Sequence, residues 1–104
     1  MLTESAFPYE GTSHHFMILT KKHITDPQKI TGTMWSEIGS LMKYTTEKYK
    51  IPGGSMFFRF GEMHTNGSTI DHVHFHVLSG NATEIDKEET REAIRVKLGY
   101  KKIK

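Results

Sequence analysis

The chain has 104 residues, of which 36% are hydrophobic and 25% charged, and its net charge is +2. This length allows one domain with one modest core, and the composition argues against an intrinsically disordered chain. The small net charge argues against a general nucleic-acid-binding surface, and the absence of cysteine excludes disulfides and thiolate metal sites.

The apolar residues are spread along the chain in short runs. None approaches the ~18 consecutive residues that a membrane span requires, and the first residues, Met1-Leu2-Thr3-Glu4, lack the basic and apolar regions of a signal peptide. We therefore expect a cytoplasmic protein with neither a membrane nor a nucleic acid as its partner.

The first half of the chain contains a strand pattern followed by a helix pattern. Residues 14–20 form a mostly apolar run that predicts a buried strand. Apolar residues then recur at helical spacing and predict an amphipathic helix over 33–49, with Thr31 or Thr33 as its N-cap. The positions that define this helix are Met34, Trp35, Ile38, Leu41, Met42 and Tyr49.

The second half continues with strand patterns. After a Pro-Gly-Gly turn, residues 55–60 predict a second strand, residues 62–68 a loop, and residues 69–78 a third strand. The charged C-terminal extension, 81–104, ends in an apolar–basic alternation that predicts an edge strand over 94–100. We expect one α+β domain over 1–104, an antiparallel sheet with one main helix packed on it.

Three of the seven histidines lie in one stretch of five residues within the third predicted strand. His72, His74 and His76 would share one face of this strand and form a row about 13 Å long, because same-face residues lie ~6.6–6.8 Å apart. Val73, Phe75 and Val77 would face the core and hold the row rigid. Clustered imidazoles are costly to bury, so we expect the row to line a cleft.

Three interpretations of this row are open. A solvated face that happens to be rich in histidine is the simplest. A zinc site is the second, although three successive same-face positions reach too far for easy tetrahedral closure and no cysteine lies nearby. Nucleophilic catalysis is the third, because an imidazole with a pKa near 6.5 is largely neutral at pH 7 and can attack phosphorus without a separate base.

Two motifs carry a resemblance to a known family. Asp71-His72-Val73-His74-Phe75-His76-Val77-Leu78 resembles the motif of the histidine triad (HIT) superfamily of nucleotide hydrolases and transferases. His15-Phe16-Met17-Ile18-Leu19-Thr20-Lys21-Lys22-His23 is similar to the same family's upstream strand, with Thr20 in place of the usual proline. With Ala6-Phe7-Pro8-Tyr9, which resembles the family's Phe-Pro-Tyr segment, the similarity covers about residues 6–80.

The resemblance implies a covalent mechanism and names its catalytic residues. His74 would attack the α-phosphorus and form a nucleotidyl-histidine intermediate, which water then hydrolyses. His72, together with His15, would orient His74, and His76 would bind the phosphate or the leaving group. The reaction would need neither a metal nor a cofactor.

The resemblance also implies substrate-binding positions and an assembly. Thr69 stands where the family often has a Ser or Thr against the phosphate, Ser68 lies beside it, and His23 lies at the edge of the site. The implied substrate is a dinucleoside polyphosphate or a nucleoside phosphoramidate, and the implied assembly is a homodimer of HIT-like architecture.

Two departures from the family pattern keep an alternative open. Gly61 stands where the family commonly has an Asn or Gln that contacts phosphate, and little sequence precedes Phe7. A non-catalytic or slow nucleotide-binding module of the same fold is therefore the alternative to a hydrolase. Removal of AMP from nucleic-acid ends is a further activity of related proteins, which the small net charge disfavours.

Overall fold

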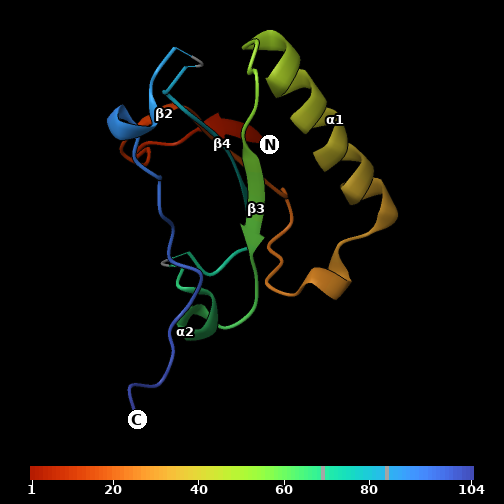
Figure 1. The fold of residues 1–104 in the computed structure, drawn as a ribbon. Helices are drawn as coiled ribbons and strands as arrows, with labels where there is room; N and C mark the ends of the chain where they lie inside the picture. The colour runs from red at the N-terminus through yellow and green to blue at the C-terminus, as the bar shows by residue number, and fades with distance from the viewer. Residues whose placement is uncertain (69, 84) are drawn as a thin grey trace.

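The computed structural model describes residues 1–68, 70–83 and 85–104, and a four-stranded antiparallel sheet is its framework (Figure 1). The sheet has the order β1-β2-β4-β3. Its strands are β1 (Leu2–Glu4), β2 (Thr12–Leu19), β3 (Ser55–Arg59) and β4 (His74–Gly80), and the helices are α1 (Gly32–Lys48) and the single-turn α2 (Met63–Asn66). Short 3-10 turns lie at Pro27–Lys29 and Glu88–Thr90. The predicted α+β class, with one main helix, is confirmed.

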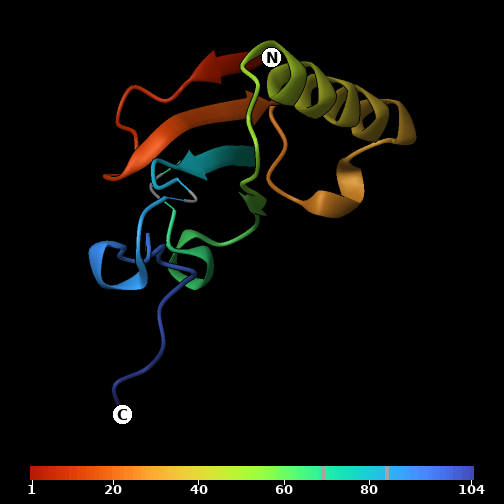
Figure 2. The same ribbon diagram turned by 45° about the horizontal axis from the view of Figure 1, so that its top comes forward.

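The helix α1 begins where the sequence predicts it. Thr31 is the N-cap, since its hydroxyl accepts a hydrogen bond from the amide of Met34 at 3.2 Å. Ile38 is buried on the sheet-facing side of the helix, and Leu41 and Met42 pack partly against the same core. Both ribbon views place α1 on one side of the sheet (Figures 1 and 2).

The sheet has two unlike faces because side chains alternate along each strand. Phe16 and Ile18 of β2 and Phe75 and Val77 of β4 are buried in one hydrophobic cluster with Ile38 of α1. The residues between them point to the opposite face, which α1 leaves uncovered. This second face carries His15, His74 and His76.

The predicted strand over 94–100 is wrong. The described part of the C-terminal segment contains no strand, and both views show it passing α2 and leaving the sheet (Figures 1 and 2). Its backbone is hydrogen-bonded to α2, where the amide of Tyr100 donates to the carbonyl of His64 at 3.3 Å. Alternation is necessary for an amphipathic strand, but a strand also needs an unpaired edge beside it. The fourth strand is instead β1, which pairs with β2.

Candidate active site

Strand β4 holds two of the three motif histidines. His74 and His76 lie on the face away from α1, and Phe75 between them is buried in the core. On this face His76 lies opposite Met17 of β2 and Phe57 of β3, while His74 lies opposite Leu19 and Arg59. The alternation that the sequence predicts therefore exists over residues 74–78.

His72 lies before the strand rather than in it. The pairing of β2 with β4 ends at Leu19 and His74, and the amide of Val73 donates instead to the carbonyl of Ile24 at 2.6 Å. The predicted strand over 69–78 thus begins five residues late and ends two residues later, at Gly80. Because the chain bends here, His72 does not continue the row of His74 and His76.

A cleft of about 470 Å³ opens over this face of the sheet. His74, His76 and His15 line it and are only 2%, 7% and 6% exposed, so their rings are not solvated surface groups. The other lining residues are Thr3, Glu4, Ser5, Ala6, Phe7, Tyr9, Met17, Arg59, Ser68 and Ile70.

The proton position of His74 follows from its partner. Its Nδ1 lies 2.8 Å from the backbone carbonyl oxygen of His72. A carbonyl can only accept, so Nδ1 carries the proton and donates it in this hydrogen bond. In the neutral ring Nε2 is then the nitrogen with the free lone pair. The contribution of His72 to this contact is its backbone rather than its imidazole.

Two consecutive hydrogen bonds, starting at a backbone amide, determine which ring nitrogen of His15 and of His76 carries the proton. The amide of Tyr9 donates to Nδ1 of His15 at 3.1 Å, which leaves the proton of a neutral His15 on Nε2. This Nε2 lies 2.9 Å from Nδ1 of His76 and donates to it. The proton of His76 is therefore on Nε2, which is buried and has no hydrogen-bond partner among the described residues.

The environment keeps His76 neutral. Burial, with the neighbouring His74, His15 and Arg59, lowers the pKa of His76 to about 4. Burial also lowers the pKa of His15. The ring of Phe57 stacks on that of His76 with centroids 4.7 Å apart, and Tyr9 stacks on it at 5.9 Å. At pH 7 His76 thus presents a fixed, neutral N–H donor.

The structure brings together some predicted site residues and separates others. His15 contacts His76, whereas the family resemblance implies that it orients His74 together with His72. His72 hydrogen-bonds the hydroxyl of Thr20 at 3.0 Å, and the ring of His23 meets that of His72 at 5.1 Å. Burial and the neighbouring His23 lower the pKa of His72.

Of the two predicted phosphate-binding residues, Ser68 and Thr69, the structure describes only Ser68. Ser68 lines the cleft, and its hydroxyl accepts from the amide of Ile70 at 2.9 Å. Thr69 lies outside the described residues.

Sequence reasoning missed Arg59, Tyr9 and Phe57. Arg59 and Phe57 share the cleft-facing side of β3, which a period of two could have indicated because an arginine interrupts a run of three aromatic residues. Tyr9 acts partly through its backbone amide, and a backbone donor leaves no signal in the side-chain pattern.

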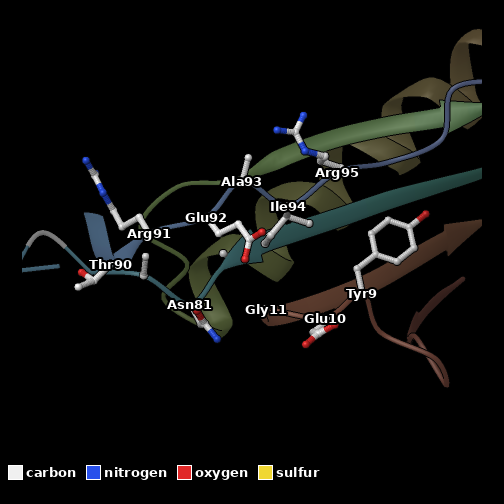
Figure 3. Close-up of a pocket in the computed structure, with 12 residues that line it drawn as sticks. Tyr9, Glu10, Gly11, Asn81, Thr90, Arg91, Glu92, Ala93, Ile94 and Arg95 are labelled. Carbon is white, nitrogen blue, oxygen red and sulfur yellow. The ribbon is translucent and has the colours of Figure 1, made fainter. Parts of the chain in front are cut away.

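Figure 3 shows a second pocket, of about 640 Å³. Tyr9 lines both this pocket and the histidine cleft. Ile94 lies in the second pocket near Gly11 and Gly80, and the close-up shows Arg91 and Arg95 pointing away from Glu10. No histidine lines this pocket. Its larger volume therefore does not make it the better candidate for nucleophilic chemistry.

A metal site was one interpretation of the histidine row. Within residues 1–68, 70–83 and 85–104, no group of three or more His, Cys, Asp or Glu side chains is arranged to hold a metal ion. The Nδ1 atoms of His74 and His76 are both engaged in the hydrogen bonds given above. The two rings are thus oriented by protein groups.

Comparison of the sequence with known protein families gives no match, and neither does comparison with curated proteins. Among the helices of the described residues, none has the length and apolar character needed to cross a membrane. The residues and geometry of the histidine cleft therefore carry the functional argument.

Proposed function

We propose that this protein is a nucleotide hydrolase or nucleotidyltransferase of the histidine triad type, acting on a phosphoanhydride or phosphoramidate through a nucleotidyl-His74 intermediate. One observation carries the proposal. His74 has its proton on Nδ1 and a free lone pair on Nε2, while the N–H of the adjacent His76 is buried and has no hydrogen-bond partner among the described residues. The two rings lie with centroids 4.8 Å apart. A nucleophile and a donor for phosphate oxygen thus share one cleft.

The reaction divides into two displacements. In the first, the lone pair of His74 Nε2 attacks the α-phosphorus, and the bond to the leaving group breaks with its electron pair on the leaving atom. The positive charge on the modified imidazole is stabilised because Nδ1–H donates to the carbonyl of His72. In the second, water attacks phosphorus, releases a proton to solvent and returns the electron pair to Nε2.

The solvated-face interpretation fits these positions poorly. Solvated histidines would be exposed, whereas His74 is 2% exposed and is held by a hydrogen bond to backbone. A buried polar ring is retained at a cost, which favours a functional role. The proposal also includes the HIT-like architecture, the cytoplasmic location and the homodimer that the sequence resemblance implies.

Replacing His74 tests the proposal. His74→Asn keeps a polar side chain but removes the attacking nitrogen, so turnover of adenosine or guanosine polyphosphates and phosphoramidates should fall by at least ~10³-fold while binding survives. Acid quench and mass spectrometry should trap a nucleotidyl adduct on the wild type, mapped to His74.

His64→Asn is the matched control, because His64 is an exposed histidine that pairs with Glu62. It should behave as wild type. Nucleotide binding without any adduct or turnover would contradict the enzyme and support the non-catalytic binding module instead. An adduct on another residue would contradict the assignment of the nucleophile.

A further inference from the structure

Arg59 is a buried cation beside the histidine cleft. It is 9% exposed, and among the described residues no carboxylate forms a salt bridge with it. Its guanidinium donates to the backbone carbonyl of Asn66 and, at 3.5 Å, to the hydroxyl of Tyr9, and it lies over the ring of Phe57. Hydrogen bonds to neutral oxygens leave the charge uncompensated, so an anionic ligand would stabilise this arrangement.

The position of Arg59 relates it directly to the proposed chemistry. Arg59 on β3 pairs with His74 on β4, and both residues line the cleft. Side chains opposite each other on one face have Cβ atoms about 4.5–5.5 Å apart. The guanidinium also lies near enough to His76 to contribute to its low pKa. An anion bound beside His74 and His76 would therefore meet Arg59.

Arg59 supplies positive charge to the site, but its hydrogen-bonded histidines supply no proton. If His76 gave its Nε2 proton to a leaving group, Nδ1 would have to take a proton from His15. His15 would then need one at Nδ1, where its partner is the amide of Tyr9, a group too weakly acidic to release its proton. This series of hydrogen bonds therefore ends at a group that cannot supply a proton. An amine leaving group needs protonation as it departs, whereas a phosphate leaves as an anion.

We propose that Arg59 binds the leaving group, and that the site selects phosphoanhydrides, whose leaving group departs as a phosphate anion, over phosphoramidates. This inference rests on the proposed function. As His74 Nε2 bonds to the α-phosphorus, the bond from phosphorus to the bridging oxygen breaks and its electron pair stays on that oxygen. Arg59 and the N–H of His76 stabilise the added negative charge, and no proton is transferred in the step.

Two substrates with the same transferred group test the selection. Diadenosine triphosphate releases ADP, and adenosine 5′-phosphoramidate releases ammonia. Wild type should have the higher kcat/KM on the triphosphate. Arg59→Gln should lower that value about 10²-fold, the typical effect of removing one oxyanion donor, and change the value for the phosphoramidate less than threefold. Arg59→Lys should be intermediate, because lysine keeps the charge without the planar fork.

Arg95→Gln is the matched control, because Arg95 is exposed and lines the other pocket (Figure 3). It should change neither rate. Equal losses on both substrates in Arg59→Gln would mean that Arg59 only holds the fold through Asn66, and would overturn the inference, as would a wild type that prefers the phosphoramidate. Should Arg59→Gln fail to fold, Arg59→Lys carries the same comparison.

Binding separates this inference from the proposed function. By calorimetry, Arg59→Gln should weaken ADP binding at least tenfold and leave adenosine binding unchanged. A wild type that binds ADP but forms no His74 adduct defeats the enzyme proposal, while a tenfold loss in Arg59→Gln would still support Arg59 as the anion-binding group. Unchanged ADP binding in that variant overturns the role of Arg59 whether or not the protein turns over.

Discussion

His74 and His76, which are neighbours in this cleft, have opposite tautomers. The carbonyl of His72 can only accept and the amide of Tyr9 can only donate, so each fixes the proton of the ring it contacts. The result is a free Nε2 on His74 and a protonated Nε2 on His76. A row of chemically identical side chains thereby acquires distinct roles from groups of the backbone.

The His15–His76 hydrogen bond can be tested at this scale. His15→Phe removes the donor to Nδ1 of His76, so His76 should populate both tautomers, and turnover should fall about tenfold, corresponding to one net hydrogen bond. Nitrogen-15 chemical shifts report the tautomer directly. His14→Phe alters the adjacent residue, which stacks on Phe16, and should leave His76 unchanged. A single, unaltered His76 tautomer in His15→Phe would show that His15 does not determine the position of the His76 proton.

The sequence indicates which residues of the site alternate, but not what each of them contacts. Period two in β4 correctly separates Phe75 from His74 and His76. It assigns His72 to the same row, because the end of the ladder depends on where β2 turns away at Thr20. The cross-strand neighbour Arg59 depends on the register of β3, which no local pattern in β4 contains.

Among the elements, those with strong local signals are predicted closely. The helix begins and ends within a residue of its expected bounds, because its cap and its apolar spacing lie within one continuous segment. The strands 12–19 and 55–59 follow their apolar runs in the same way. Strand β1, only three residues long, forms through pairing with β2 and has no pattern of its own. The segment 94–100 alternates apolar and basic residues but lies beside α2, not beside a sheet edge. Its pattern therefore predicts a strand that does not form.

The N-cap of α1 provides a prediction about stability. Thr31→Ala removes the side-chain acceptor of the Met34 amide and should lower the free energy of unfolding by about 1 kcal/mol in urea denaturation. Thr33→Ala is the matched control, since Thr33 is exposed inside the first turn and should be neutral or slightly stabilising. Equal effects of the two substitutions would show that the cap contributes nothing.

At the scale of the whole molecule, the buried histidines make stability depend on pH. The pKa of His76 is near 6.5 in an unfolded chain and about 4 in the fold. Between these values the unfolded chain holds a proton that the folded protein lacks, so stability present above pH 6.5 is lost as the pH falls toward 4. Burial shifts the pKa values of His15 and His72 in the same direction.

Removing the titrating group should flatten this dependence. Wild type should lose more unfolding free energy than His76→Gln between pH 7 and pH 4, by at most about 3 kcal/mol, the full value of the shift. Urea titrations at half-unit pH intervals measure the difference, in which the shared titration of carboxylates cancels. His64→Gln, at an exposed position, should retain the wild-type slope. Parallel curves for wild type and His76→Gln would rule out this effect.

The two-sided sheet also constrains how this protein can evolve. A one-residue insertion or deletion within β4 would exchange its faces, bringing Phe75 into the cleft and the imidazoles into the core. Such a change would disrupt the hydrophobic core and the cleft together, so β4 tolerates point substitution better than insertion or deletion. Alternate positions of β4 are then under separate constraints. One set must pack in the core, and the other must line the cleft. If the constraint on the cleft were lost, substitutions would accumulate at His74 and His76 while Phe75 and Val77 stay apolar.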